Sequence, residues 1–206
     1  MKKFKKFKIE NLKKVTKNDS NKIIELILKE NPSSILASLE KIFISKYLNK
    51  VATSKDALLY VIRFEEKIIG YAIIVKKIQV LISFFSNIKI KIIFNMMKRF
   101  ELYTLLNVII SFFKLDIIFV KKKFKRIIKL NYNLNLLAIE KKFQSKGLGT
   151  FFLNKIFKSI KNSKYITVET VESAATRFYI LKHNFKLAGK KLRFPKKQSI
   201  LFKKII

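Results

Sequence analysis

Cysteine is missing from the 206-residue sequence, which excludes disulfides, thiolate nucleophiles and thiolate metal sites. Acidic residues are few, since 13 Asp and Glu stand against 46 Lys and Arg and leave a formal net charge of +33. Such a charge usually indicates a nucleic acid, an anionic membrane or an acidic substrate as partner. An AT-rich coding sequence is the competing explanation, because Lys, Ile, Asn and Phe are over-used while Ala, Gly and Pro are scarce. The tightest basic run, residues 121 to 126, matches no nucleic-acid module, so we expect no nucleic-acid partner.

A long hydrophobic run is also missing. Residues 78 to 115 are dense in Ile, Leu and Phe, but lysines divide them into uncharged runs of about eleven residues, and a bilayer span needs about twenty. The basic N-terminus lacks the apolar segment and cleavage site of a signal peptide, so a cytoplasmic protein is the expectation. Two interpretations of residues 78 to 130 stay open. They form helices that pack on a sheet or on a second subunit of a homodimer, or a basic amphipathic surface that lies on anionic lipid.

Half of the residues are hydrophobic, which is enough for one core, so we expect a single domain over residues 1 to 206 with a helical insertion at about 78 to 130. Alternating and helical patterns predict the elements in order. They are a strand over 4–14, helices capped by Asp19 or Ser20 and by Ser34, strands over 57–64, 67–75 and 132–140, a helix from the loop that contains Gly147 and Gly149 to 161, a strand over 165–170, a helix over 173–182, and strands over 185–192 and 199–205. This order predicts an α/β fold with a mixed sheet and helices on both of its faces.

Two of the four glycines stand close together between a predicted strand and a predicted helix, in the run Gln-Ser-Lys-Gly-Leu-Gly. A helix start offers free backbone N–H groups and a favourable dipole to an anion. Glycine leaves room for a diphosphate and allows backbone angles that turn N–H groups inward. The alternative is a tight turn in a Rossmann-like domain, although the run lacks the dinucleotide and P-loop spacings. The predicted anion cradle comprises Gln144, Ser145, Lys146, Gly147, Leu148, Gly149 and Thr150.

The same run matches the pattern Q/R-x-x-G-x-G/A, and the chain resembles the GNAT N-acetyltransferase superfamily around it. Residues 136 to 143 are similar to the family's fourth strand and its exit, and residues 174 to 179 are similar to its A-x-x-F-Y helix. The paired helices and the hairpin that ends in Ile-Ile-Gly-Tyr are similar to the family's first half. The resemblance implies the GNAT acyl-CoA N-acyltransferase fold, with a mostly antiparallel sheet and a helical insertion after the third strand.

The resemblance also implies a cofactor and a set of site residues. Acetyl-CoA is the implied acyl donor, with its pantetheine arm on the backbone of Leu137, Ala138 and Ile139, its diphosphate on the glycine loop, and a further contact at Ser173. Tyr179 matches the family's tyrosine, whose hydroxyl protonates or hydrogen-bonds the coenzyme A sulfur. Phe185 follows it by six residues where the family usually has five, and Asn184 stands in the place of a glycine. No metal is implied.

The base and the acceptor are less defined. Acetyl transfer needs a neutral amine, and Glu169 is the candidate base, with a base acting through water, or no base, as alternatives. We expect an acetyl-CoA-dependent N-acetyltransferase that works by direct attack of a primary amine, with an amino sugar of cell-surface glycan synthesis as the preferred acceptor. A protein or peptide N-acetyltransferase, and a non-catalytic acyl-CoA-binding or membrane-surface module of the same fold, are the alternatives.

Overall fold

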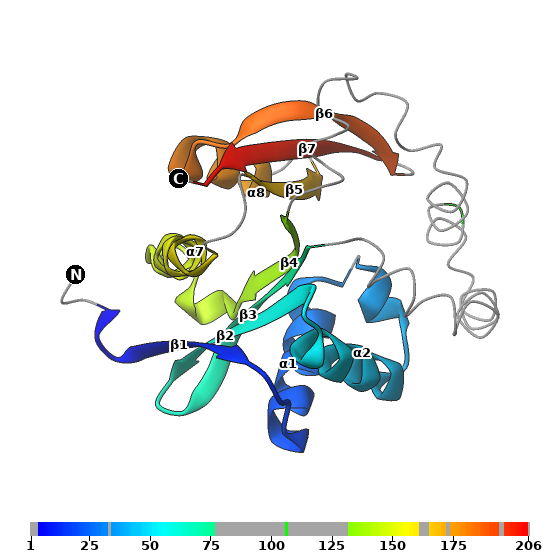
Figure 1. The fold of residues 1–206 in the computed structure, drawn as a ribbon, viewed down its shortest axis with the longest axis vertical. Coiled ribbons are helices and arrows are strands. Elements are labelled where there is room, and N and C mark those ends of the chain that lie inside the picture. Colours follow the sequence, from blue (N-terminus) through cyan, green and yellow to red (C-terminus); the bar gives the residue numbers. More distant parts are fainter. Residues whose placement is uncertain are drawn as a thin grey trace. The chain divides into compact units, whose positions relative to one another are not determined.

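The computed structural model describes residues 4–32, 34–76, 106, 132–160, 165–171, 174–193 and 196–205 (Figure 1). The chain divides into two compact units, Met1–Lys76 with Leu134–Asn162, and Lys77–Asn133 with Ser163–Ile206. Apart from Leu106, the expected insertion at 78 to 130 lies outside the described residues, and so do the homodimer and membrane interpretations that depend on it.

The first unit is a sheet covered by helices, and its strands follow the order β1-β2-β3-β4. Strands β1 and β2, and β2 and β3, pair antiparallel. The elements are β1 (Phe7–Leu12), α1 (Lys17–Glu30), the 3₁₀ turn η2 (Ile35–Ser38), α2 (Lys41–Thr53), β2 (Ala57–Phe64), β3 (Lys67–Val75), β4 (Tyr132–Ile139), the 3₁₀ turn η4 (Lys141–Phe143) and α7 (Leu148–Ser159). The two hairpin strands β2 and β3 have the predicted bounds, because each is a nearly continuous apolar run and only the polar turn interrupts the two runs.

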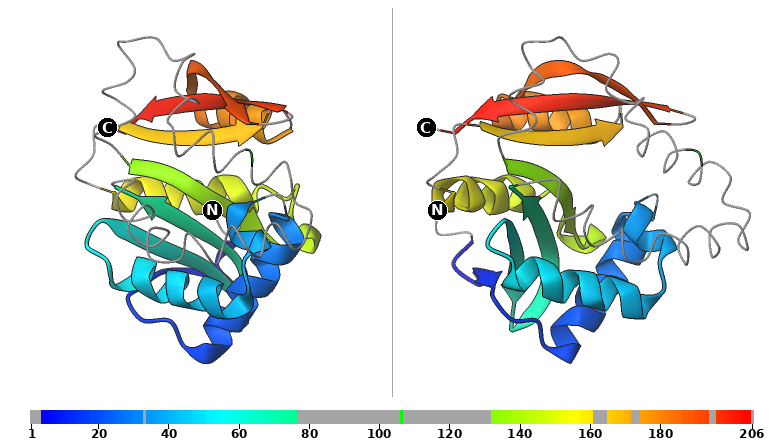
Figure 2. Two further views of the ribbon diagram at one scale, coloured as in Figure 1. Left: turned by 90° about the vertical axis from the view of Figure 1, so that its right-hand side faces the viewer. Right: turned by 45° about the vertical axis from the view of Figure 1, so that its right-hand side comes forward.

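Helices cover both faces of this sheet, as predicted (Figure 2). The hydroxyl of Tyr60 on β2 lies 2.7 Å from Ser159 Oγ of α7. Tyr71 is paired in register with Val61, so it points to the opposite face, where its hydroxyl donates to Asn31 Oδ1 at the end of α1 at 2.6 Å. The helix after the glycine loop buries one stripe of side chains: Leu148, Phe152, Ile156 and Ile160 are at most 3% exposed.

The start of α1 differs from the prediction. The helix begins at Lys17, and Thr16 caps it by accepting from the Asp19 N–H at 3.1 Å. Asp19 is instead one partner of Arg63, whose Nη2 lies 2.8 Å from Asp19 Oδ1 and whose Nε also contacts Glu10. The carboxylate that resembles a cap in the sequence is therefore used in an ion pair with β2.

The second predicted helix is two elements. Ser34 does accept from the Ala37 N–H at 3.2 Å, but it caps only the 3₁₀ turn η2. The chain is extended at Leu39 and Glu40, and α2 begins at Lys41 without a side-chain cap. The hydrophobic spacing runs through both elements, which is why the sequence pattern does not show the break.

The second unit contains a three-stranded antiparallel arrangement in the order β5-β7-β6. Its elements are β5 (Tyr165–Val171), α8 (Ala174–Arg177), the π-helical turn η5 (Phe178–Lys182), β6 (Lys186–Arg193) and β7 (Lys196–Lys204). The predicted helix over 173–182 is thus one α-helical turn followed by one π-helical turn, packed beside β5 (Figure 2). The last strand begins at Lys196, three residues before the predicted start.

His183, the single histidine, ends the π-helical turn and is 2% exposed against the ring of Phe178. Burial, with the positive charge of Lys203 adding to it, lowers the pKa of His183 to about 4. Between this value and the unfolded pKa of about 6.5, the unfolded chain binds more protons than the folded one. The contribution of His183 to stability is therefore complete above about pH 6.5 and decreases as the pH falls toward 4.

We expect the free energy of unfolding to fall by about 2 kcal/mol between pH 7 and pH 4.5 because of this group alone. Urea unfolding followed by circular dichroism at several pH values measures the change. His183→Gln is the control, because glutamine does not titrate and its profile should be flatter by that amount over the same range. Parallel profiles of the two proteins would contradict the prediction.

Candidate functional site

The predicted cradle begins where β4 leaves the sheet. Glu140 N–H donates to Ile69 O at 2.7 Å, which holds the strand exit to β3. The chain then makes the 3₁₀ turn η4, with Phe143 N–H donating to Glu140 O at 2.8 Å and Gln144 N–H to Lys141 O at 3.1 Å. The glycine loop therefore starts from a hydrogen-bonded turn.

The loop itself has two residues with left-handed backbone, Ser145 at φ 59° and Gly147 at φ 80°. Gly147 is the N-terminal cap of α7 and has ψ near 0°, and its carbonyl accepts from Phe151 N–H at 3.0 Å. Gly149 lies in the first turn of the helix without a positive φ, so the two left-handed residues of the loop are Ser145 and Gly147. The role left to Gly149 is to keep the helix start free of a side chain.

The first backbone N–H groups of α7 are open. Leu148, Gly149 and Thr150 lie in the first turn, where no carbonyl one turn earlier in the helix is available to them. Among the residues that the structure describes, no acceptor is found for these three N–H groups. Together with the helix dipole, they are a set of donors suited to a phosphate oxygen.

The charges around the loop come from Lys142 in η4 and from Lys146 in the loop itself. Lys146, predicted to add positive charge, is exposed and its Nζ donates to Lys142 O at 2.9 Å. Lys142 Nζ lies 3.3 Å from Glu140 Oε1 and over the ring of Phe143. Lys146 is thus held against the loop by a backbone carbonyl rather than by a carboxylate, and it keeps its charge available to an anion.

Half-buried phenylalanines form the apolar base of the loop. The rings of Phe4 and Phe151 stack with centroids 4.8 Å apart, and Phe143 meets Phe7 edge-on at 6.2 Å and Phe64 at 5.6 Å. The cluster ties the N-terminal segment, the end of β2, η4 and α7 together. Sequence reasoning did not single out these residues, because they are scattered over about 150 positions and show no common spacing.

The segment predicted for the pantetheine arm, Leu137 to Ile139, is the end of β4. Leu137 is half-buried, and Ala138 and Ile139 are buried. Gly70 on β3 packs directly against this segment: a Cβ at Gly70 would lie 2.7 Å from Ala138 O. Gly70 also lies beside the register shift between Ile62 and Arg63. A glycine inside a strand often marks a bulge or a close approach of another backbone, and Gly70 shows both.

Gly70→Ala is expected to destabilise the protein by about 2 kcal/mol, because overpacking a fitted core costs about this much. The new methyl would also lie 2.9 Å from Ile62 Cγ2 and 3.0 Å from Ile139 Cγ1, so relief requires a shift of the β4 backbone. Urea unfolding followed by circular dichroism gives the free energy. An unchanged midpoint would show that the two strands are less closely packed than described.

Tyr179 lies in the second unit, on the π-helical turn, and is 6% exposed. Its ring packs edge-on against Phe185 with centroids 5.4 Å apart, and Asn184 between them has φ 55°. The extra residue of this spacing is absorbed by the wider π-helical turn, and Asn184 adopts the left-handed backbone that a glycine would otherwise supply. π-helical turns are frequent at functional sites.

Burial raises the pKa of the Tyr179 hydroxyl well above its usual value, so the group keeps its proton at neutral pH. In the described part of the chain the hydroxyl has no hydrogen-bond partner. The side chain is 6% exposed, but the hydroxyl oxygen is not among the fully enclosed polar atoms that lack a partner in the described part of the chain, so it keeps some contact with solvent.

The candidate base Glu169 is in an ion pair: its Oε2 lies 2.8 Å from Lys191 Nζ, and its side chain is 26% exposed. Asn133, early in β4, donates to Thr167 Oγ1 at 3.1 Å. Ser173, the other predicted cofactor contact, lies outside the described residues. Over the described ranges no group of His, Asp and Glu could hold a metal ion, and no helix is long and apolar enough to cross a membrane.

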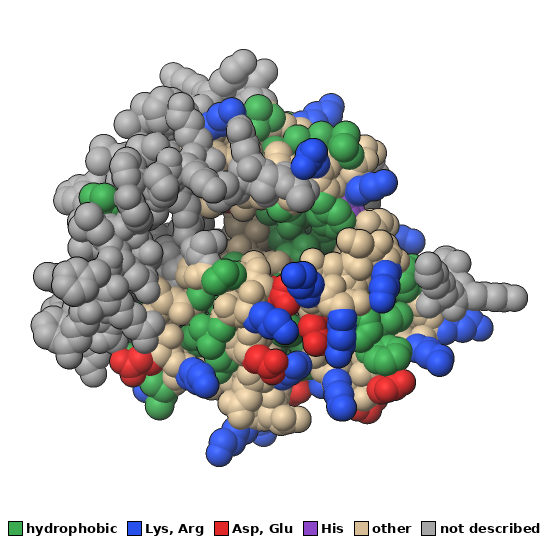
Figure 3. Space-filling view, turned by 180° about the vertical axis from the view of Figure 1, so that it is seen from behind, with side chains coloured by type: hydrophobic (Ala, Val, Ile, Leu, Met, Phe, Trp, Pro, Cys, Tyr) green, Lys and Arg blue, Asp and Glu red, His purple; other side chains and the backbone are tan. Residues whose placement is uncertain are grey.

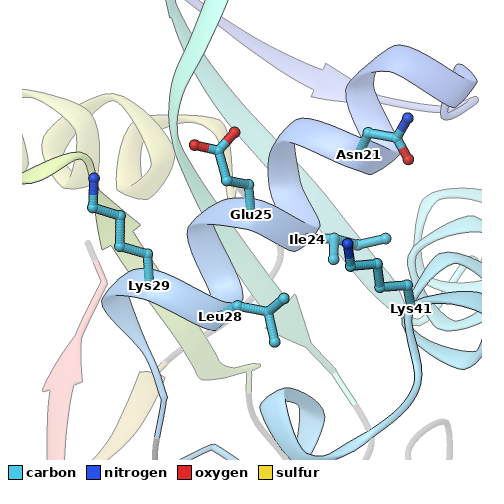
Figure 4. Close-up of a pocket in the computed structure, with 6 residues that line it drawn as sticks. All are labelled: Asn21, Ile24, Glu25, Leu28, Lys29 and Lys41. Atoms are coloured by element: carbon cyan, nitrogen blue, oxygen red, sulfur yellow. The ribbon is translucent and has the colours of Figure 1, made fainter.

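A hollow of about 530 Å³ lies elsewhere in the first unit, along the outer side of α1 and the start of α2 (Figure 4). Its lining mixes charged, polar and apolar side chains: Asn21, Ile24, Glu25, Leu28, Lys29 and Lys41. None of these residues belongs to the predicted site. Figure 3 shows that Lys and Arg side chains are scattered over the visible face rather than gathered in one stripe, which agrees with a compositional origin for much of the charge.

Neither a protein-family model nor a curated protein matches the sequence. Solved structures do match the fold. An acetyltransferase of the GNAT family from Streptococcus pneumoniae is 13% identical, with a TM-score of 0.57 over 97% of this chain and 99% of that one. A GNAT family acetyltransferase from Elizabethkingia anophelis with acetyl-CoA bound is 14% identical, with a TM-score of 0.53 over the same shares. Arabidopsis thaliana NAA60 in complex with acetyl-CoA is 10% identical, with a TM-score of 0.55 over 97% and 98%.

These matches cover nearly the whole chain, and they agree with the order of strands and helices that the sequence predicts. The chain therefore has the fold of the GNAT acetyltransferases.

Proposed function

We propose that the protein is an acetyl-CoA-dependent N-acetyltransferase that acetylates a primary amine by direct attack. The observation that carries the proposal is Gly147 at φ 80°, which starts α7 directly after the β4 exit and leaves the first N–H groups of the helix open. Two solved structures of the same fold have acetyl-CoA bound, which supports this ligand for the loop.

In this proposal the diphosphate binds Gln144 to Thr150, and the pantetheine arm follows the backbone of Leu137, Ala138 and Ile139. Ser173 is a further cofactor contact. The amine nitrogen attacks the thioester carbonyl carbon, the carbon–sulfur bond breaks, and the departing thiolate receives a hydrogen bond or proton from Tyr179. The absence of cysteine excludes an acyl-cysteine intermediate and agrees with direct attack.

Glu169 is the proposed base that takes the proton from the amine, through the carboxylate oxygen that Lys191 does not occupy. Glu169→Gln separates this role from a purely structural ion pair. A base predicts a fall in kcat with an unchanged KM for acetyl-CoA. An unchanged kcat would show that the carboxylate serves only the ion pair. The amine would then lose its proton through water or bind in its neutral form.

For the acceptor we propose an amino sugar, preferably one linked to a nucleotide, of the kind used in cell-surface glycan synthesis. The support is electrostatic: a protein with a net charge of +33 attracts an anionic acceptor and repels a polyamine. A peptide amine is the competing acceptor, and acidic peptides share the same attraction. Assaying amino sugars and peptides side by side separates these two classes of acceptor.

The test is release of free coenzyme A from acetyl-CoA, measured with a thiol reagent over a panel of nucleotide-linked amino sugars, free amino sugars, amines and peptides. The protein has no cysteine, so the reagent reports coenzyme A alone. Turnover with an amino sugar supports the full proposal, and turnover with a peptide corrects the acceptor. Binding of acetyl-CoA without turnover on any acceptor would support a non-catalytic acyl-CoA-binding module, and no binding would overturn the proposal.

A further inference from the structure

Glu30 is the last residue of α1, where a carboxylate is unfavourable for the helix. The C-terminal end of a helix carries a partial negative charge, so an acidic side chain there is repelled. The same residue also lies close to a loop that we propose binds a diphosphate, where negative charge is again unfavourable. Two unfavourable positions for one carboxylate indicate that its contacts serve a purpose.

Both oxygens of Glu30 are used at the turn between β4 and the glycine loop. Oε1 accepts from the Lys141 N–H at 3.2 Å, and Oε2 accepts from Gln144 Nε2 at 3.1 Å. Gln144 Nε2 also donates to Ile139 O at 2.6 Å. One carboxylate therefore holds the first residue of η4 and the first residue of the predicted cradle, and Gln144 links it to the end of β4.

The end of α1, which carries Glu30, is itself held in place by hydrogen bonds. The next residue, Asn31, ends α1, donates its N–H to Ile27 O at 3.0 Å and accepts from the Tyr71 hydroxyl at 2.6 Å. Tyr71 is fully buried on β3. Burial, with the charges of Tyr47 and Glu30 adding to it, raises the pKa of Tyr71. The end of α1 is thus held to the sheet, and the hydrogen bonds of Glu30 hold the turn before the glycine loop to this helix end.

We propose that Glu30 is a positioning residue for the diphosphate loop. By holding Lys141 and Gln144 it sets where the loop and the start of α7 lie relative to the β4 exit. The inference rests on the proposed function for its ligand, but the contacts that carry it are independent of the ligand. Glu30 does not touch the reacting atoms in this assignment.

Two substitutions distinguish positioning from simple electrostatics. Glu30→Ala removes both acceptors and the charge, whereas Glu30→Gln removes the charge and keeps one amide oxygen for the Lys141 N–H. If the charge dominated, both variants would bind acetyl-CoA more tightly. Positioning instead predicts that Glu30→Ala weakens binding about fivefold, since lost hydrogen bonds of this kind contribute about one kcal/mol, and that Glu30→Gln recovers part of the loss.

The experiment measures the Kd of acetyl-CoA by calorimetry, and hydrogen exchange of the backbone amides from 141 to 148 in the unliganded protein. Glu25→Ala is the matched control, because Glu25 lies on the same helix, is exposed and, within the described residues, pairs only with Lys22, at 2.9 Å. We expect faster exchange at Lys141 in Glu30→Ala alone. The KM for acetyl-CoA should rise while kcat stays unchanged, and the melting temperature should stay close to that of the wild type, because the variant also removes the unfavourable charge at the helix end.

The outcomes separate the two proposals. Wild-type protein that binds no acetyl-CoA overturns the proposed function, and unchanged exchange at Lys141 in Glu30→Ala overturns the positioning role whatever the ligand. Wild-type binding with an equal or lower Kd in Glu30→Ala overturns the positioning role alone. Weaker binding in Glu30→Ala with partial recovery in Glu30→Gln, and none of these changes in Glu25→Ala, supports it.

Discussion

Gly147→Asp and Gly149→Asp are each expected to abolish acetyl-CoA binding, with at least a hundredfold increase in Kd. Both positions lie at the start of α7, where the open N–H groups are proposed to hold the diphosphate. A carboxylate about 4 Å from a phosphate costs about 4 kcal/mol at the effective dielectric of a protein surface, before screening by salt. Even a reduced penalty of about 2.7 kcal/mol is a hundredfold in Kd. Calorimetry with acetyl-CoA measures the loss.

Asparagine at the same positions is the matched control, because it has nearly the shape of aspartate without the charge. At Gly147 the side chain must also accept the left-handed backbone, and this chain already places Asn184 at φ 55°. Space is available there, since among the described residues an added Cβ would meet only Phe4 Cζ, at 3.7 Å. We therefore expect the asparagine variants to lose much less affinity than the aspartate variants.

Stability separates loss of the site from loss of the fold. Aspartate in the first turn of a helix is favoured by the dipole, and replacing a helical glycine removes a cost of about 0.5 to 1 kcal/mol. Gly149→Asp should therefore be at least as stable as the wild type while it fails to bind. Aspartate variants that bind acetyl-CoA with wild-type affinity would remove the loop from the site.

Tyr179→Phe is expected to lower kcat about a hundredfold, the usual contribution of a positioned acid, and to leave the KM for acetyl-CoA unchanged. The Tyr179 side chain is buried, and its hydroxyl keeps its proton at neutral pH and has no partner among the described residues. Because its pKa is raised, it is better suited to donate a hydrogen bond to the departing thiolate than to transfer its proton completely. Steady-state kinetics with the acceptor found in the panel checks the result.

Tyr60→Phe is the control, because Tyr60 is also a buried tyrosine, but its hydroxyl is hydrogen-bonded to Ser159. We expect this variant to lose about 1 kcal/mol of stability and to keep its kcat. Tyr179→Phe should show the opposite pattern, with unchanged or higher stability, since no hydrogen bond within the described residues is lost. Equal kcat values for Tyr179→Phe and the wild type would leave Tyr179 a packing residue.

Features carried by neighbouring residues were predictable. The hairpin strands β2 and β3 have their predicted bounds because a continuous apolar run and the polar turn that ends it are local properties. The glycine loop was located between a strand and a helix for the same reason, since Gly147 and Gly149 lie within three residues of each other. Its open N–H groups follow from the geometry of any helix start.

Features that depend on a distant partner were not predictable. Aspartate is a residue type that often caps helices, but the carboxylate of Asp19 forms an ion pair with Arg63, which lies 44 positions later in the chain. Glu30 carries no motif, and its partners Lys141 and Gln144 are more than 100 residues away in the chain. The sequence offered only one signal for Glu30, an acidic residue at the wrong end of a helix.

The sequence by itself determined the order of the elements, the position of the glycine loop and the place of Tyr179 in its motif, because each depends on short-range spacing. Tertiary structure decided which glycine takes the left-handed backbone, how a π-helical turn absorbs the extra residue before Phe185, and that Glu30 holds the turn before the loop. The Glu30 contacts join segments more than 100 residues apart in the chain, and the other two features are backbone conformations that residue spacing alone does not specify. Periodicity does not encode such contacts; packing and hydrogen bonding in the folded state select them.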